Sequence, residues 1–83
     1  MPHFMDMHSG MLGLTPKQLA ETHAKDLAVE TKYGVHYIKY FYDAATGKIF
    51  CFSEAPSKEA ALAVLGEAHG NMPDDIFEVE EFE

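Results

Sequence analysis

Four side chains in this sequence are of types that bind transition-metal ions through nitrogen or sulfur. They are the single cysteine and three of the five histidines: His8, His23, Cys51 and His69. Imidazole nitrogen and thiolate sulfur suit nickel, zinc and copper, whereas calcium and magnesium prefer sites built from oxygen ligands. No CxxC, HxH or HExxH pattern occurs, so spacing along the chain does not by itself define a metal site.

Each of these residues also has a purely structural interpretation. His23 lies within a predicted apolar helix stripe, where a histidine commonly hydrogen-bonds a carbonyl group, and Cys51 can be a small buried hydrophobe. His69, which precedes Gly70, can stabilise a helix C-terminus, and His8 at a strand end can face water. Catalysis is less supported, because a cysteine in mid-strand presents its thiol poorly to a substrate. The sequence therefore favours a binding protein over an enzyme.

The strands that must position these side chains are indicated by alternation and turn signals. One strand is predicted over residues 3–8, and a β-hairpin over 34–54 with its turn between Asp43 and Gly47. A last strand is predicted over 76–80. Aromatic and β-branched residues are frequent in both arms of the hairpin, which is typical of paired strands.

The hairpin register follows from pairing Asp43 with Lys48 across the turn. Each face then receives three cross-strand pairs, because side chains alternate along a strand. One face receives Tyr42–Ile49, Tyr40–Cys51 and Ile38–Ser53, and the other receives Phe41–Phe50, Lys39–Phe52 and Tyr37–Glu54. Both faces are largely apolar, as expected of a sheet that is covered on both sides.

Two helices are predicted between the strands. The first begins with a capping box at Thr15 and Gln18, and it is expected to end near Tyr33 with Gly34 in a left-handed exit. Its expected inward stripe is Leu19, Ala20, His23, Ala24, Leu27 and Ala28. The second helix follows the cap residue Ser57, and its expected stripe is Ala61, Val64, Leu65 and Ala68.

This order of elements predicts a single α+β domain over residues 1–83. Two strand–helix–strand halves form a split βαβ sandwich, a four-stranded antiparallel sheet with both helices on one face. Chain direction places four candidate ligands in one half of the domain: His8, His23, Cys51 and His69. His36 and Glu54 belong to the other half. We therefore expect the imidazoles of His8 and His69 to meet at one rim of the sandwich.

Composition and charge exclude several classes of function. The net charge of −8 argues against nucleic-acid binding, which requires a basic surface. No apolar run approaches the ~20 residues that span a bilayer, and the first residues lack the basic start and apolar block of a secretory signal. One cysteine cannot form an internal disulfide, so the reducing cytoplasm is the expected compartment.

The short chain also predicts self-association. A domain of 83 residues buries only about 60% of the surface that its unfolded chain exposes. The sheet face opposite the helices would expose several aromatic side chains, a larger apolar patch than soluble monomers usually carry. We therefore expect a homodimer that forms through this sheet face.

Segments spread over nearly the whole chain carry a combined pattern. They are Phe4–His8, His23–Leu27, Tyr33–Val35, Asp43 with Gly47, Phe50–Pro56, Glu67–Gly70 and Ile76–Val79. This pattern resembles the small bacterial nickel-binding-protein family, most of whose members are known only as a domain of unknown function. The resemblance implies a ferredoxin-like α/β sandwich that is usually dimeric. It also implies nickel, or another divalent transition metal, as the bound ion.

Residue by residue, the polar signature of that family corresponds to His8, His23, Asp26, Cys51, Glu54 and His69. The resemblance implies His8, His23, Cys51 and His69 as metal ligands, with Asp6 or Glu54 completing the shell. Several relatives carry a histidine where this chain has Leu65, and another carries one where this chain has Ser9. This chain therefore has fewer potential ligands than those relatives.

A second hypothesis belongs to a different class. It describes a dimeric α/β-barrel protein that binds, or acts on, a small organic molecule between the sheet and the helices. Tyr40, Phe41 and Phe50 would line an apolar pocket, and His23 would be the acid–base group. A structure distinguishes the two hypotheses, because a metal site requires histidines that lie close together, whereas the second hypothesis requires a pocket.

Overall fold

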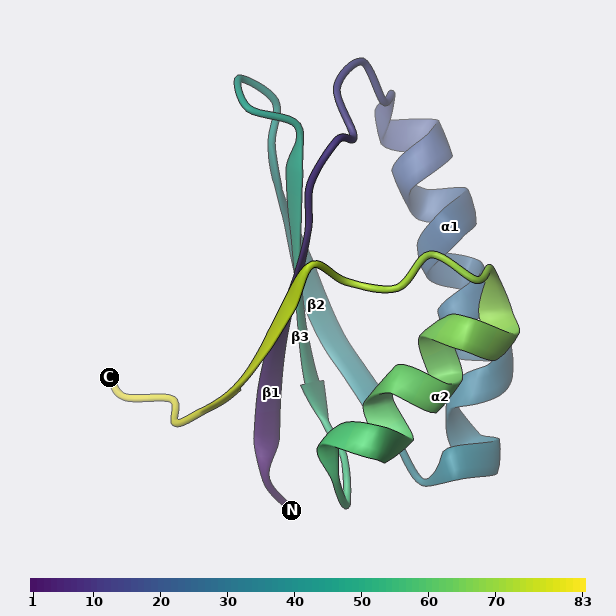
Figure 1. The fold of residues 1–83 in the computed structure, drawn as a ribbon, viewed down its shortest axis with the longest axis vertical. Helices are drawn as coiled ribbons and strands as arrows, with labels where there is room; N and C mark the ends of the chain where they lie inside the picture. Colours follow the sequence, from purple (N-terminus) through teal and green to yellow (C-terminus); the bar gives the residue numbers. More distant parts are fainter.

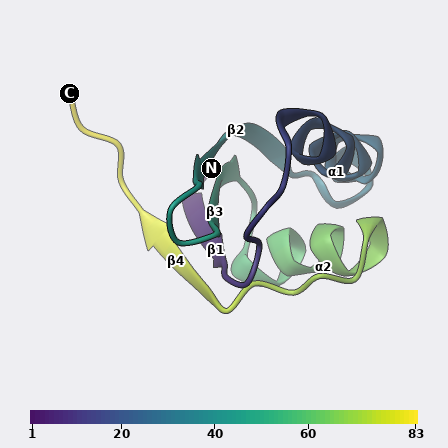
Figure 2. The same ribbon diagram turned by 90° about the horizontal axis from the view of Figure 1, so that it is seen from above.

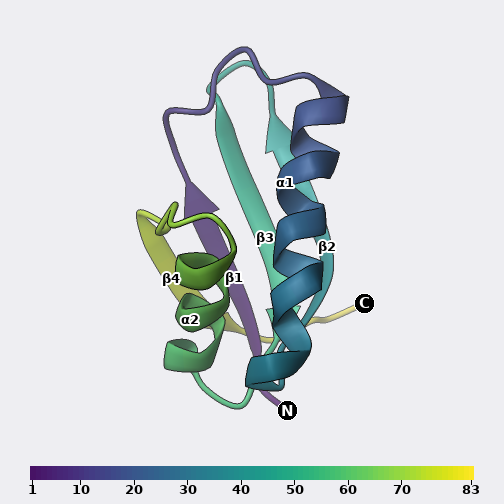
Figure 3. The same cartoon turned by 90° about the vertical axis from the view of Figure 1, so that its right-hand side faces the viewer.

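The computed structural model describes all residues, 1–83, and its elements follow the predicted order. They are β1 (His3–His8), α1 (Pro16–Val29), the 3₁₀ helix η1 (Glu30–Tyr33), β2 (His36–Asp43), β3 (Lys48–Glu54), α2 (Lys58–Ala68) and β4 (Asp75–Val79). The four strands form one antiparallel sheet in the order β2-β3-β1-β4. Both helices cover the same face of this sheet (Figures 1 and 3). The fold is the predicted ferredoxin-like α+β sandwich.

The two ends of the first helix confirm the local sequence signals. The Gln18 N–H donates to the Thr15 hydroxyl oxygen at 3.2 Å, and the Thr15 N–H donates to the Gln18 side-chain oxygen at 2.9 Å. At the other end the α-helix tightens into η1, and Gly34 ends it with φ of 70°. Only glycine adopts this left-handed conformation without strain.

The inward stripe of α2 is as predicted except that Ala68 is only half-buried, whereas that of α1 is not. Ala61, Val64 and Leu65 are completely buried in the apolar core. In α1 only Leu19 of the expected stripe is fully buried; His23 is half-buried, and the remaining four residues are exposed: Ala20, Ala24, Leu27 and Ala28. The helix is rotated so that Asp26 faces the sheet. Alanine contributes little area on any helix face, and on the face turned inward Asp26 contacts His69.

The hairpin register holds for most of its length and then shifts. Pairing from Asp43–Lys48 to Lys39–Phe52 is as predicted, but a β-bulge at Ile38 ends the regular alternation. The expected pairs Ile38–Ser53 and Tyr37–Glu54 are therefore wrong; Tyr37 lies opposite Ser53, and His36 lies opposite Glu54. The shift buries Tyr37, whose N–H donates to Glu30 Oε2 at 2.8 Å and whose hydroxyl donates to the Ala61 carbonyl at 3.3 Å.

The loop between β1 and α1 lies against the turn of the hairpin. The Met11 N–H donates to the Gly47 carbonyl at 2.9 Å, and the Tyr42 hydroxyl donates to the Met11 carbonyl at 2.7 Å. At Gly47 a Cβ atom would lie 2.6 Å from the backbone nitrogen of Leu12. Glycine at this turn therefore permits the close approach that fixes the loop.

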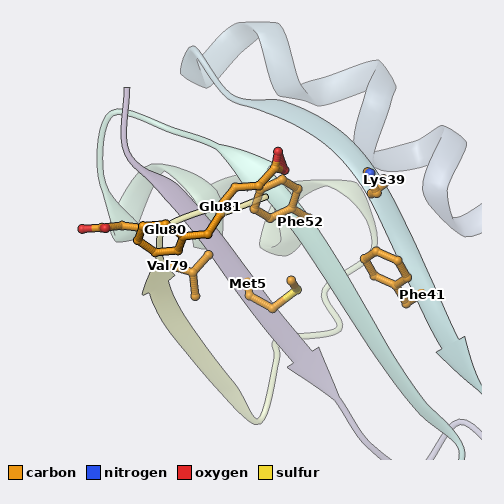
Figure 4. Close-up of a pocket in the computed structure, with 8 residues that line it drawn as sticks. Met5, Lys39, Phe41, Phe52, Val79, Glu80 and Glu81 are labelled. Atoms are coloured by element: carbon orange, nitrogen blue, oxygen red, sulfur yellow. The ribbon is translucent and has the colours of Figure 1, made fainter.

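The sheet face opposite the helices is uncovered (Figure 2). It carries Met5, Phe41 and Phe52, and the chain after Val79 leaves the sheet on this side (Figure 1). Half of the Phe41 surface is exposed. These side chains line a depression of about 300 Å³, together with Lys39, Val79, Glu80, Glu81 and Phe82 (Figure 4). No helix of the structure has both the length and the apolar character needed to cross a membrane.

Candidate metal centre

Three potential metal ligands meet on the helix-covered side of the two central strands. Asp6 and His8 alternate along β1 and so project from the same face, and Cys51 of β3 lies directly opposite Asp6. All three residues are buried, and one ligand atom of each lies within 4.8 Å of the others. The register of two paired strands therefore brings a carboxylate, an imidazole and a thiol together.

Asp6 is the most constrained member of this group. Its side chain is completely buried, and its Oδ1 atom lies 2.9 Å from His8 Nε2. Its other oxygen, Oδ2, has no hydrogen-bond partner. Burying a carboxylate oxygen without a partner is costly, and proteins usually satisfy such an atom with a donor or a cation. Oδ2 is therefore available to an ion inside the group.

A second histidine–aspartate pair faces the first from the helix layer. His69, the C-cap residue of α2, places its Nε2 atom 2.9 Å from Asp26 Oδ1 of α1. Both side chains of this pair are almost fully buried. The Asn71 N–H donates to His69 Nδ1 at 3.1 Å and so orients the ring.

His8, His69 and Asp26 line one small cavity, whereas Asp6 lies outside its lining. The ring centroids of His8 and His69 are 6.5 Å apart with an interplanar angle of 68°. The cavity between them measures about 40 Å³ and is also lined by Asp26, Cys51 and Met11, among others. The chain direction inferred from the sequence therefore does bring the imidazoles of residues 8 and 69 to a common rim.

Burial sets the protonation of two groups around this cavity. Burial raises the pKa of Cys51, and the carboxylates of Asp6 and Asp26 raise it further. Burial also raises the pKa of Asp26, although the neighbouring His69 and His23 oppose that shift. Without a bound ion the thiol of Cys51 is therefore protonated at neutral pH. A protonated, buried thiol is a poor nucleophile, but a metal ion can displace its proton.

The other predicted residues lie outside the group of three. His23 packs against Tyr40 with ring centroids 4.7 Å apart and planes tilted by 41°, beside a neighbouring cavity of about 30 Å³ that Asp26 and Cys51 also line. Glu54, considered as an additional ligand, projects from the open face at the far end of β3. Leu65 is completely buried in the apolar core.

Sequence reasoning underestimated Asp26 and the loop after α2. Asp26 was among the candidate residues only because of the family resemblance, although its position three residues after His23 places both side chains on one side of α1. Ser9 binds Asp74 through both its N–H and its hydroxyl. This contact ties the segment after His69 to the end of β1. It depends on residues far apart in the sequence, so no local signal could reveal it.

The cavities between sheet and helices are too small for the organic-ligand hypothesis. They measure about 40 and 30 Å³, whereas pockets for small organic molecules typically measure about 300–1,000 Å³. Tyr40 and His23 do lie together, but Phe41 projects from the opposite face of the sheet, where it lines the open depression. The interior of this sandwich has room for an ion or a water molecule.

The fold and this centre define a class: small ferredoxin-like proteins whose interior contains imidazole, thiol and carboxylate groups. The chain belongs to the family described as nickel responsive protein SCO4226-like, whose model matches residues 4–79. The crystal structure of SCO4226 from Streptomyces coelicolor A3(2) is similar to this chain, with 46% sequence identity and a TM-score of 0.92. The match covers 98% of this chain and 99% of that one. No protein of curated function matches the chain.

Proposed function

We propose that this protein binds a divalent transition-metal ion at Asp6, His8 and Cys51, with His69 and Asp26 at the edge of the same cavity. The observation that carries the proposal is the unpartnered Oδ2 atom of Asp6, buried beside an imidazole and a thiol. A bound cation would supply the partner that this oxygen lacks. Nickel is the ion of choice because the family is described as nickel responsive.

The ligand types select the class of ion. One nitrogen, one sulfur and one oxygen donor suit nickel, zinc, cobalt or copper, whereas a thiolate is a poor ligand for calcium or magnesium. The cavity of about 40 Å³ that His8 and Cys51 line has room for a water molecule or an ion of similar size. When bound, the ion would supply a positive charge that favours the thiolate form of Cys51.

The chain contributes orientation as well as ligands. Asp6 and Cys51 are held by the paired strands β1 and β3, and the backbone N–H of Asn71 fixes the ring of His69. Ligands on rigid strands hold their geometry better than ligands on loops. His23, the fourth ligand predicted from the sequence, lines the neighbouring cavity. We propose that it acts indirectly, because its electrostatic interaction with Asp26 lowers the pKa of that carboxyl.

We also propose that the protein works as a cytoplasmic homodimer that forms through the open sheet face. Exposed aromatic side chains support this proposal, since Phe41 and Phe77 are each 50% exposed. The depression on this face carries Lys39 on one side and Glu80 with Glu81 on another (Figure 4). A second copy related by twofold symmetry can place its lysine against these carboxylates, so the face is complementary to itself.

Isothermal titration of untagged protein with nickel chloride tests the metal site. We expect one high-affinity ion per protomer, with binding at least tenfold weaker in Cys51→Ser and His8→Ala. Ser53→Ala is the matched control, because Ser53 is equally buried on β3 and its hydroxyl has no hydrogen-bond partner. This variant should bind nickel as the unmodified protein does.

Absorption spectroscopy separates loss of a ligand from loss of the fold. A nickel–thiolate absorption band should appear in the unmodified protein and in Ser53→Ala, but it should be absent in Cys51→Ser. Circular dichroism of each metal-free variant checks that it is folded. Equal nickel affinity in Cys51→Ser, His8→Ala and the unmodified protein would contradict the proposed site.

A further inference from the structure

One short segment after α2 forms part of the wall of the buried cavity. Residues 70–74, termed the strap, connect the C-cap of α2 to the first residue of β4 and cross from the helix layer to the sheet (Figure 1). Asn71 of the strap lines the cavity of about 40 Å³ together with His8, Cys51 and His69. Because Asn71 is also exposed, the strap lies between this cavity and the solvent.

The helix end of the strap has the properties of a hinge. The Gly70 N–H donates to the Leu65 carbonyl at 3.0 Å, and Gly70 has a φ of 76°. A Cβ atom at this position would meet nothing within 4 Å, so glycine is required here for its conformation and not for space. Glycine changes its backbone angles at little steric cost, which is what a hinge residue must do.

The sheet end of the strap is closed by one carboxylate. The Ser9 N–H donates to Asp74 Oδ2 at 2.7 Å, and the Ser9 hydroxyl donates to the same oxygen. These hydrogen bonds lower the pKa of Asp74, so its carboxylate is ionised at neutral pH. Hydrogen bonds to an ionised acceptor are stronger than those between neutral groups. Since Ser9 follows His8 directly in the chain, this contact closes the strap beside a proposed ligand.

Little else holds the strap in place. Its residues are exposed except for Pro73, which is half-buried. The Asn71 N–H donates to His69 Nδ1 at 3.1 Å, and the Asp74 N–H donates to the Met7 carbonyl at 2.8 Å. Segments with few buried contacts open at a lower free-energy cost than the whole domain unfolds. The strap can therefore open while the sheet and the helices stay folded.

We propose that the strap is a gate to the buried cavity, with Gly70 as its hinge and the contact between Ser9 and Asp74 as its latch. When the latch opens, Asn71 leaves the cavity wall and His69 loses the N–H that orients its ring. The thiol of Cys51 then becomes accessible from solvent. The passage of a metal ion through this gate rests on the proposed function, whereas the accessibility of the thiol does not.

Alkylation of Cys51 by iodoacetamide measures the opening without any metal ion. Cys51 is the single cysteine and is buried, so its thiol reacts only when the cavity opens. Mass spectrometry of untagged, metal-free protein should show alkylation about tenfold faster in Asp74→Ala, because this variant loses two hydrogen bonds to a carboxylate. Ser9→Ala retains the N–H donor and should show a smaller increase.

Asp75→Ala is the matched control for Asp74→Ala. Asp75 is also exposed and carries the same charge, but its carboxylate accepts a hydrogen bond only from the N–H of the adjacent Ile76. This variant should be alkylated as slowly as the unmodified protein. Equal rates in Asp74→Ala and Asp75→Ala would overturn the inference.

Urea separates opening of the strap from unfolding of the domain. Opening a short segment exposes little surface, so the alkylation rate of Asp74→Ala should depend only weakly on urea below the unfolding transition. Global unfolding exposes the whole core and depends steeply on urea. An alkylation rate that rises as steeply as the unfolding equilibrium, measured by circular dichroism, would show that Cys51 reacts only in unfolded protein and would overturn the gate.

Release of nickel to excess EDTA tests whether ions pass the same gate. Nickel should leave Asp74→Ala about tenfold faster than Asp75→Ala, while the dissociation constants differ by less than about threefold, because easier opening accelerates entry and release alike. Equal release rates would overturn the passage of ions through the strap. Absence of nickel binding in every protein would contradict the proposed function alone, and the alkylation rates would still decide whether the strap opens.

Discussion

The two faces of the sheet differ in the side chains that they bury and expose. The helix-covered face buries Asp6, His8 and Cys51 near one end, and the uncovered face displays Met5 and Phe41. Buried polar groups and exposed apolar groups each cost free energy in an isolated protomer. The two proposals address this contrast: a bound cation would partner the buried polar groups, and a second copy of the chain would cover the open face.

The covered face is itself divided along its length. Toward α2 and the start of β1 it is mostly apolar, with Phe4, Val64 and Leu65 in the core cluster. Toward the end of β1 it becomes polar at the His8–Asp6 and His69–Asp26 pairs. We infer that the apolar half provides most of the folding free energy. This free energy offsets the cost of burying polar groups in the other half, where they can bind an ion.

The largest expected effect comes from the apolar half. Leu65→Ala should lower the free energy of unfolding by about 3 kcal/mol, because it removes a completely buried side chain and leaves a cavity. Urea denaturation of metal-free protein measures this change. A loss below about 1 kcal/mol would mean that the apolar half is not the main source of stability.

The open face provides the next test. Phe41→Lys should weaken self-association by about 2 kcal/mol, because a half-exposed aromatic ring in the proposed interface is replaced by a charge. Leu27→Lys is the matched control, since Leu27 is 43% exposed on α1, away from the open face. Sedimentation velocity should show dissociation only for Phe41→Lys. Equal behaviour of the two variants would remove the distinction between the faces.

The pH dependence of nickel binding tests the polar half. Because the pKa of Cys51 is raised well above neutral, the thiol is protonated in the metal-free protein and must release its proton when an ion binds. Nickel affinity should therefore increase with pH, by about tenfold per pH unit for each proton released. Between pH 7 and 8, Cys51→Ser should show a smaller slope, as measured by titration in two buffers. An unchanged slope would exclude the thiol as a ligand.

The smallest expected effect is that of Asp26 on the stability of the metal-free protein. Asp26→Asn should stabilise metal-free protein by about 1 kcal/mol at pH 7, because it removes a carboxyl whose burial raises its pKa. A group with a raised pKa in the folded state disfavours folding once pH exceeds its unfolded pKa, so this gain should vanish in acid. Thermal unfolding at pH 7 and pH 3 measures the difference, and a gain of equal size at both would contradict this explanation.

Local signals in the sequence predicted the parts of the fold that depend on neighbouring residues. The Thr15 capping box and the glycine exit at Gly34 involve contacts within a few residues, and both were predictable. The rotation of α1 was not, because it depends on Asp26 meeting His69 from another element. The candidate centre was partly predictable, since chain direction placed His8, Cys51 and His69 together, but the role of Asp6 became clear only from its unpartnered oxygen.

The bulge in β2 has a consequence for how this strand tolerates changes in length. Because Ile38 has no partner in the ladder, removing it would leave Tyr37 opposite Ser53 and His36 opposite Glu54, now in an uninterrupted strand. What the additional residue provides is curvature, since a bulge bends its strand and increases the local twist. Ile38 therefore determines the shape of the sheet edge. Its deletion would not change the sheet face to which each neighbouring side chain points.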